Sequence, residues 1–232
     1  TEPGDRKGIS MSNIHPALVR GNTALVTGGA SGIGLAAAQA FARAAMNVVI
    51  VDLGKDRLHA ALSAIEPHFA NKECQAAAYD CDVSSETTIA KMKGQVLKRF
   101  GSVDVLMNNA GIGLSSALDG PLETWHKVID VNLWGIINMT HAFLPDMLSS
   151  QRDGLIINTG SKQGITCPPG NPAYNVSKAG VKVFTEALEH DLRNRASAKL
   201  SAKLLIPGFV YTPMTRGNHN EKPDAAWTPE QT

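Results

Sequence analysis

The stretch Thr27-Gly28-Gly29-Ala30-Ser31-Gly32-Ile33-Gly34 decides the fold that this sequence predicts. It follows an apolar, β-branched run over 23–27 and precedes an alanine-rich stretch over 35–45 with strong helix propensity. A strand, a glycine turn and a helix, in this order, are what a dinucleotide site requires. The glycines let the backbone turn sharply and let a pyrophosphate approach the first N–H groups of the helix.

The glycine spacing is GxxxGxG rather than GxGxxG, and a plain turn between a strand and a helix is the alternative explanation. The stretch Asn47–Asp52 (NVVIVD) favours the dinucleotide site. It resembles a second buried strand and ends in an acid about 20 residues past the glycines, where a ribose-binding carboxylate belongs. We therefore predict these cofactor contacts: Gly28, Ser31, Gly32, Ile33, Gly34 and Asp52.

Asp52 also bears on which nicotinamide cofactor the protein takes. A carboxylate can accept hydrogen bonds from both ribose hydroxyls of NAD, whereas a 2′-phosphate about 4 Å away would suffer roughly 4 kcal/mol of repulsion per charge. Neither Leu53 nor Ser31 offers a compensating cation. We expect NAD rather than NADP. The nearby cations Lys55 and Arg57 are the residues that would favour NADP instead.

Length and composition indicate a single domain. The chain has 232 residues, 43% of them apolar, which is enough for one substantial core. Lys and Arg number 22 against 21 Asp and Glu, so the net charge of +1 gives no field that would attract nucleic acid or an anionic membrane. The three cysteines lack metal-ligand spacing, and we expect reduced thiols and no metal.

The first twenty residues are polar and lack the apolar core of a signal peptide. We predict a polar N-terminal extension over 1–20 and a dinucleotide-binding and catalytic domain over 21–232. No apolar run approaches the roughly 18 residues that a membrane span needs, so we expect a cytoplasmic protein.

Strand-like and helix-like stretches alternate along the chain. Further strands are expected over 75–80, 103–107, 154–159 and 199–206, and further helices over 55–69, 84–100, 121–149 and 172–196. This alternation predicts an α/β fold, a doubly wound parallel sheet of the Rossmann type with helices on both faces. The stretch 209–232 is rich in Pro, Asn, Thr and Gly and is predicted to be a substrate loop with at most short helical pieces.

Asp82 and Val83 follow the third predicted strand. Ligands of a doubly wound sheet bind at the carboxyl ends of its strands, so both residues are candidate contacts and Asp82 is a candidate adenine contact. The alternative is an acid that merely precedes a helix N-terminus, and the residues alone leave both open.

Tyr174 and Lys178 lie four residues apart on a predicted helix, so their side chains emerge on one face. A phenol with a pKa of about 10 is a poor base at neutral pH. An ammonium roughly 5 Å away would favour the phenolate by roughly 3 kcal/mol, or around two pKa units. Ser161 follows the fifth strand and can meet Tyr174 at one substrate oxygen, which predicts general acid/base chemistry.

Several motifs together resemble the short-chain dehydrogenase/reductase family from about Gly21 to Met214. They are Thr27 to Gly34, Asn108-Asn109-Ala110-Gly111, Asn132, Ser161, Tyr174-Asn175-Val176-Ser177-Lys178 and Pro207-Gly208. The resemblance implies that Ser161, Tyr174 and Lys178 are catalytic and that Asn132 holds a water linking Lys178 to solvent. It also implies that Lys178 binds the nicotinamide ribose. The further cofactor contacts that it implies are Asn109, Ala110, Gly111, Tyr174, Pro207, Gly208, Val210 and Thr212.

The sequence departs from this family at its end. Members usually continue into a seventh strand and a final helix, whereas this sequence stops at Thr232. We expect the C-terminal strand to be missing from this chain. We also expect a homodimer or homotetramer, although the missing piece would normally contribute to subunit contacts.

The expected activity is an NAD-dependent oxidoreductase that transfers hydride between nicotinamide and a secondary alcohol or ketone. An NADP-linked 3-ketoacyl-type reductase and a catalytically silent dinucleotide-binding module are the alternatives. The substrate pocket is expected from residues 112–117, 163–171 and 209–227. Histidines at 126, 141 and 190 are expected at the surface or in an interface.

Overall fold

The structure is a computed structural model that describes residues 14–70, 73–196, 198–215 and 221–232. Six parallel strands form one sheet in the order β3-β2-β1-β4-β5-β6. Their bounds are β1 Thr23–Thr27, β2 Asn47–Asp52, β3 Ala76–Asp80, β4 Val105–Asn108, β5 Gly154–Thr159 and β6 Leu200–Leu205. The predicted α/β fold with a doubly wound parallel sheet is confirmed.

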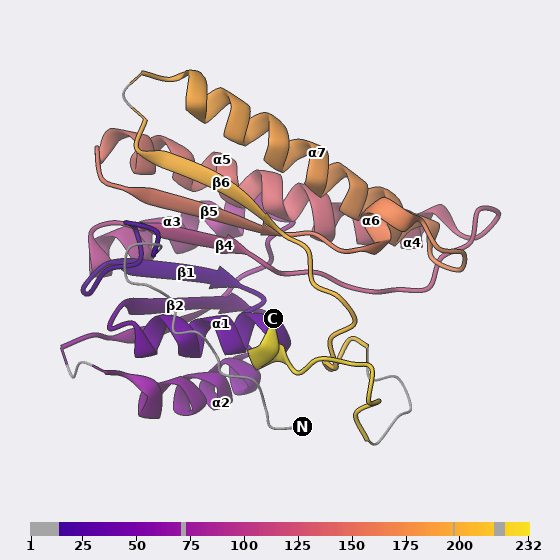
Figure 1. Cartoon of the computed structure of the whole chain (residues 1–232), viewed down its shortest axis with the longest axis horizontal. Coiled ribbons are helices and arrows are strands. Elements are labelled where there is room, and N and C mark those ends of the chain that lie inside the picture. The colour runs from indigo at the N-terminus through magenta and orange to yellow at the C-terminus, as the bar shows by residue number, and fades with distance from the viewer. Residues whose placement is uncertain (1–13, 71–72, 197, 216–220) are drawn as a thin grey trace, which may run out of the picture.

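Helices cover both faces of the sheet, as Figure 1 shows. On one face α1 and α2 pack on β1 and β2, and on the other α3, α5 and α7 pack on the central strands. The helix bounds are α1 Gly32–Arg43, α2 Lys55–Ile65, η2 Glu66–His68, α3 Glu86–Phe100, α4 Leu122–Ile129, η3 Asp130–Trp134, α5 Gly135–Ser149, α6 Gln163–Thr166, α7 Pro172–Asn194 and η4 Pro229–Gln231. Because both faces are covered, β1 is buried along its whole length.

The helix predicted over 121–149 is continuous but not uniform. One π-helical turn, η3, separates α4 from α5 and contains Asn132. Such wide turns insert an extra residue and re-aim the side chains beside them. The short helix α6 and its place before α7 were not predicted, because its four residues lie in a stretch expected to be a pocket loop.

The sheet ends at β6 within the described residues. One backbone group of this edge strand, the N–H of Ala202, donates to Glu189 Oε2 on α7 at 2.6 Å. Burial raises the pKa of Glu189, but this bond and those from Lys203 and Arg193 outweigh it and hold the pKa below its ordinary value. The predicted substrate loop continues from β6 and is joined by one bridge between Val210 and Trp227.

The described part of the predicted N-terminal extension contacts the domain. Ala17 is fully buried among apolar side chains of β1, β2 and α1. Nε2 of His15 lies 2.9 Å from Ser201 Oγ on β6. The division of the chain at residue 21 stays a prediction.

A buried carboxylate joins the amino-terminal ends of the central strands. Asp104 Oδ2 accepts the N–H of Thr23 at 2.8 Å, and Oδ1 lies 3.2 Å from Arg152 Nε. Arg152 also donates to Ser102 Oγ at 2.8 Å and to the side chain of Asn22. One guanidinium therefore links the segments that lead into β1, β4 and β5.

Replacing Arg152 by Met leaves the buried Asp104 carboxylate without its cation, so we expect the free energy of unfolding to fall by about 1–3 kcal/mol. The Arg152 side chain is 47% exposed, which keeps the loss below that of a fully buried pair. Urea denaturation measures the change. The control Lys182→Met breaks an exposed pair with Glu186 and should cost less than about 0.5 kcal/mol. Equal losses in the two variants would contradict this role of Arg152.

Candidate active site

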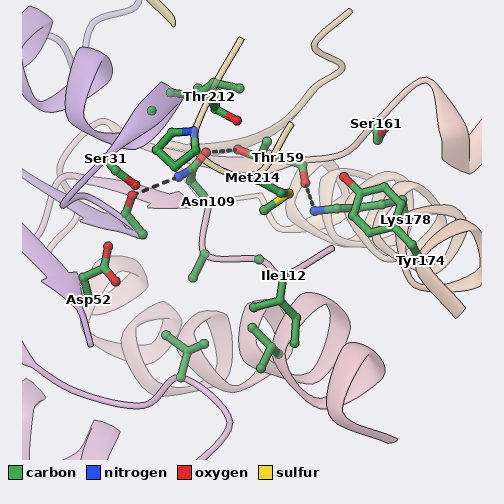
Figure 2. A pocket seen from close by; sticks show the side chains of 18 of the residues that line it. Ser31, Asp52, Asn109, Ile112, Thr159, Ser161, Tyr174, Lys178, Thr212 and Met214 are labelled. Atoms are coloured by element: carbon green, nitrogen blue, oxygen red, sulfur yellow. Dashed lines mark hydrogen bonds between the residues drawn. The ribbon is translucent and has the colours of Figure 1, made fainter. Parts of the chain in front are cut away.

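One cavity of about 770 Å³ runs along the carboxyl ends of the strands. Figure 2 shows Asp52 and Ser31 at one end and Ser161, Tyr174 and Lys178 at the other. The predicted site residues that line it are Gly28, Ser31, Gly32, Ile33, Asp52, Asp82, Val83, Asn109, Ala110, Gly111, Ser161, Tyr174, Lys178, Pro207, Gly208, Val210 and Thr212. Gly34 and Asn132 are the two predicted residues that are not among its lining.

The glycine turn leaves β1 and enters α1 with positive φ angles at Gly28 and Gly32. A Cβ at Gly28 would lie 2.9 Å from Ala110 Cα, and one at Gly34 would lie 2.2 Å from Gly28 O. Glycine at 34 therefore allows the turn and helix to pack rather than contacting the cavity. The Ser31 side chain does not cap α1, so the first N–H groups of the helix are not bonded by it.

Two backbone bonds fix the carboxylate of Asp52 at the end of β2. Its Oδ2 accepts the N–H of Ala30 at 3.0 Å and its Oδ1 accepts the N–H of Leu53 at 2.8 Å. Arg57 Nη1 lies 3.7 Å from Asp52 Oδ1, and Arg57 Nη2 donates to Ser31 Oγ at 3.4 Å. Arg57, one of the two nearby cations that count in favour of NADP, therefore lies beside the predicted ribose site.

Asp82 serves the turn before α3 as well as lining the cavity. Its Oδ1 accepts the N–H of Ser84 at 2.9 Å and the Ser84 hydroxyl at 2.7 Å. Val83 is 6% exposed and packs where a Cβ on Gly135 would stand. Asp82 therefore lines the cavity and also bonds the turn before α3, so the structure is compatible with both explanations of this residue.

The loop after β4 is bonded to the end of β1. The hydroxyl of Thr27 accepts the N–H groups of Asn109 at 2.9 Å and Ala110 at 3.0 Å. The Asn109 amide donates to the carbonyl oxygens of Thr27 and Gly28 at 3.2 and 3.3 Å. A Cβ on Gly111 would lie 3.2 Å from Asn132 Oδ1, so this loop passes close to the π-helical turn.

A row of buried polar side chains lies under the loop and connects β4 and β5 with their covering helices. Asn108 donates to Thr140 Oγ1 at 3.1 Å and to Asn158 Oδ1 at 2.9 Å. Asn158 donates in turn to Thr185 Oγ1 at 3.0 Å on α7. These hydrogen bonds hold β5 in a fixed position along α7. Thr159, the next residue of β5, lines the cavity at the end where Lys178 lies.

Lys178 is the most deeply buried charged group of the site. Its side chain descends from α7, and Nζ donates to the carbonyl oxygen of Thr159 at 2.8 Å (Figure 2). Nζ lies 5.7 Å from the centroid of the Tyr174 ring. Burial disfavours the ammonium and lowers the pKa of Lys178 to about 8.

The pKa of Tyr174 differs in direction from our expectation. Burial raises the pKa of this phenol, and a hydrogen bond with the Ser161 side chain only partly offsets the effect. Burial of the phenol therefore outweighs the lowering that was predicted from Lys178. In the free protein the phenol is therefore a proton donor at neutral pH.

Asn132 lies behind the cavity wall and not on it. Its Oδ1 accepts the N–H of Ile112 at 2.7 Å, and its Nδ2 donates to Ile112 O at 3.0 Å and to Ser177 Oγ at 3.2 Å. These bonds hold the loop after β4 against α7. The water that the family resemblance implies at Asn132 stays a prediction.

Parts of the expected substrate pocket lie in two separate hollows, whereas residues 221–227 of the expected range line neither. Positions 216–220 of that range lie outside the described residues. Ile112, Gln163 and the segment 207–215 belong to the main cavity. The loops around Ser116 and Cys167 line a second, mostly apolar hollow of about 540 Å³ beside α7. Ser116 Oγ donates a hydrogen bond to Asn171 Oδ1 at 2.8 Å. This bond joins two loops of the predicted pocket and holds Asn171 at the start of α7.

Sequence reasoning missed one wall of the main cavity. The residues are Glu123, His126, Lys127 and Asp130, all on one side of the helical stretch that follows the loop after β4. Their spacing of three and four residues could have revealed a common face, but a charged helical face is usually a solvated one. His126 was expected at the surface or in an interface, and it is exposed as well as lining the cavity.

Two findings concern ligands and surroundings. Among the described residues, His, Cys, Asp and Glu side chains do not gather in groups of three that could bind a metal ion. Over the same ranges, no helix has both the length and the apolar character that a membrane crossing demands.

Comparison with known proteins identifies the family of the chain. The family model of the short chain dehydrogenases matches residues 22–223. The chain belongs to the short-chain dehydrogenase family. One relative, the 3-oxoacyl-(acyl-carrier-protein) reductase FabG of Thermotoga maritima, is 35% identical over 198 residues, which cover 85% of this chain and 77% of that protein. Another, the 1-deoxy-11-beta-hydroxypentalenate dehydrogenase of Streptomyces avermitilis, is 32% identical over 84% of this chain and 71% of that protein.

Solved structures of this family agree with the fold. A short chain dehydrogenase/reductase from Burkholderia phymatum in complex with NAD superposes with a TM-score of 0.79 at 32% identity, covering 84% of this chain and 68% of that one. NAD⁺-bound xylitol dehydrogenase superposes with a TM-score of 0.76 at 29% identity, covering 83% and 72%. Both similarities extend the family assignment to the three-dimensional arrangement of the sheet.

The buried amine of Lys178 predicts a pH-dependent stability. The pKa of the Lys178 amine is near 10.5 in the unfolded chain and about 8 in the folded protein, so above pH 8 the unfolded chain binds more protons. The free-energy cost of burying the charged amine therefore acts in full below pH 8, and it decreases as the pH rises. We expect wild type to gain about 2 kcal/mol relative to Lys178→Met between pH 7 and about pH 9.5. Chemical denaturation of both proteins across this range gives the difference, and a difference that does not change with pH would contradict the buried charge.

Proposed function

We propose that this protein is an NAD-dependent oxidoreductase that interconverts a secondary alcohol and a ketone, with Tyr174 as general acid and base. The observation that carries the proposal is the single cavity, in which Ser161, Tyr174 and Lys178 share one hollow with a glycine turn and Asp52. Family membership supports chemistry at a CH–OH or carbonyl carbon.

The residues at the glycine turn fit a dinucleotide. A Cβ at Gly28 would clash with Ala110, and the first turn of α1, which lines the cavity, lacks a side-chain cap. A bound nicotinamide supplies the hydride acceptor or donor for the substrate carbon. The residues that would hold the cofactor are Gly28, Ser31, Gly32, Ile33, Asp52, Asp82, Val83, Asn109, Ala110, Gly111, Tyr174, Lys178, Pro207, Gly208, Val210 and Thr212.

The chain's own groups can manage the proton at the substrate oxygen. The Tyr174 hydroxyl gives a proton to a carbonyl oxygen or takes one from an alcohol, and the Ser161 hydroxyl donates a hydrogen bond to the same oxygen. A raised phenol pKa keeps Tyr174 protonated at neutral pH, which suits the proton-donor role in carbonyl reduction. Lys178 Nζ, which donates to Thr159 O, adds a positive charge near the ring of Tyr174.

The NADP-linked 3-ketoacyl reductase remains the second candidate. It is favoured by the Thermotoga maritima relative, whose name states reduction of a 3-oxoacyl carrier, and by the guanidinium of Arg57 beside Asp52. Our preference for NAD rests on the fixed carboxylate of Asp52 and is supported by the NAD complex of the Burkholderia phymatum neighbour. A silent binding module would not need the catalytic group at the other end of the cavity.

Exposed apolar side chains support assembly of a homodimer or homotetramer. Trp134 on η3 and Val176 and Val183 on α7 are each more than half exposed. Adjacent helices that present such side chains are suited to pack against a second copy of the chain. We also propose a cytoplasmic location, which rests on the cysteine usage.

Tyr174→Phe tests the proposed chemistry. Loss of the hydroxyl should reduce kcat by about 10²- to 10⁴-fold with secondary alcohols or ketones, because the proposed general acid and base is removed and the Ser161 hydroxyl only donates a hydrogen bond to the substrate oxygen. NAD binding should change little, since the ring remains. Nicotinamide absorbance measures turnover, and isothermal titration measures binding. The control Tyr79→Phe alters a phenol packed against the core outside the cavity and should leave turnover intact. Undiminished turnover in Tyr174→Phe would refute the mechanism.

A further inference from the structure

Three consecutive residues, Ser161, Lys162 and Gln163, line the cavity at the end where Tyr174 lies. They connect β5 to α6, which begins at Gln163. Neighbouring Cα atoms are about 3.8 Å apart, so the side chains of Lys162 and Gln163 start one and two residues from the hydroxyl that we assign to the substrate oxygen. A chemical group bound by these two side chains would therefore lie close to the reacting carbon.

The turn that carries the two side chains is fixed to the fold. The N–H of Gln163 donates to Ser161 Oγ at 3.2 Å, and the N–H of Gly164 donates to Ser161 O at 3.0 Å. A Cβ on Gly164 would lie 2.5 Å from the backbone carbonyl carbon of Lys178, so α6 packs directly on the backbone of α7. The backbone of Lys162 and Gln163 therefore has a set position relative to the catalytic lysine.

The side chains of Lys162 and Gln163 are exposed. Among the described residues, neither side chain has a hydrogen-bond or ion-pair partner. By contrast, the exposed Lys182 on α7 bonds Glu186 at 2.8 Å. A lysine ammonium has three donors on a flexible stem, and a glutamine amide has two donors, so both groups can bind an anion without breaking a contact within the protein.

Charge is distributed unevenly around the cavity. All four acids of its described lining come from the first 130 residues of the chain, and they are Asp52, Asp82, Glu123 and Asp130. The described lining residues after position 131 include two lysines, Lys162 and Lys178, and no acid. A negative charge on the substrate would be attracted to this part of the wall, whereas a positive charge would be repelled.

We infer that the substrate carries a carboxylate a few bonds from its carbonyl or hydroxyl carbon, and that the Lys162 ammonium and the Gln163 amide bind this carboxylate. The inference rests on the proposed function, because it takes Ser161 as the residue that meets the reacting oxygen. The substrate class is a short keto acid or the corresponding hydroxy acid. A carrier-bound substrate, whose negative charges lie many bonds from the reacting carbon, would not use these two groups.

Two apolar side chains of the same cavity suit the carbon chain of such a substrate. Phe209 and Met214 line the cavity and are each about half exposed. Contact with a short hydrocarbon chain would remove part of this apolar surface from water, which favours binding. The apolar side chains therefore account for the body of the substrate, and Lys162 accounts for its charge.

Reduction of 4-oxopentanoate and of its methyl ester by the full chain compares an anionic and a neutral ketone, with NADH or NADPH, whichever supports turnover. We expect a higher kcat/KM for the acid. Lys162→Gln should raise the KM of the acid about 10-fold, the effect of losing one charge-assisted hydrogen bond, and leave the KM of the ester nearly unchanged. Lys162→Arg should keep most of the preference, because it keeps the charge. Equal losses on acid and ester in Lys162→Gln, or a wild type that prefers the ester, would overturn the inference.

The matched control is Lys127→Gln, which removes an exposed lysine from the α4 wall of the same cavity. The ratio of kcat/KM for acid and ester should stay close to that of wild type in this variant. A fall in the ratio as large as that in Lys162→Gln would overturn the assignment of the carboxylate to Lys162.

A binding measurement separates this inference from the proposed reaction. Hexanoate and hexanamide, which have no reducible ketone, are titrated calorimetrically into the full chain in the presence of NAD⁺. We expect wild type to bind hexanoate about 10-fold more tightly than hexanamide, and Lys162→Gln to remove the difference. The comparison needs no turnover, so it decides the inference even if Tyr174→Phe refutes the proposed chemistry. A wild type that does not prefer hexanoate would overturn the inference and leave the proposed reaction standing.

Discussion

The whole arrangement depends on the junction between β1 and β4, where the order of strands in the sheet reverses. The hydroxyl of Thr27 accepts the two successive N–H groups that follow β4, and Gly28 has no side chain where Ala110 approaches. Successive connections leave this junction toward opposite edges of the sheet, which opens a crevice at the carboxyl ends. The close approach of the end of β1 to the loop after β4 therefore positions the glycine turn, the loop and the cavity that they line.

The sequence alone predicted the parts of the fold that local patterns control. Buried strands, the glycine turn and the four-residue spacing of Tyr174 and Lys178 are readable because they depend on near neighbours in the chain. The π-helical turn at Asn132 depends on bonds to Ile112 and Ser177, which are 20 and 45 residues away, so no local pattern indicates it. The same limit applies to the cavity wall on α4, whose charged side chains look like an ordinary solvated face.

Chemistry was harder to predict than geometry. The spacing of Tyr174 and Lys178 was readable, but the direction of the phenol pKa shift depends on burial of the phenol, and burial is a property of the folded chain. Likewise, sequence placed a cation near Asp52 without showing whether Arg57 or Lys55 reaches the cavity. Of these two basic residues in one helical turn, Arg57 lines the cavity and Lys55 does not.

Within the residues that the structure describes, β6 is an edge strand of the sheet. A bare strand edge is a template on which a strand of another chain can add, and repeated addition leads toward fibrillar aggregates. The bond from Ala202 N–H to Glu189 occupies one position of that template, and Lys203 places a charge beside it. Protonation of Glu189 at acidic pH would remove its charge and weaken its bonds to Ala202 N–H, Lys203 and Arg193, and with them the link between α7 and β6.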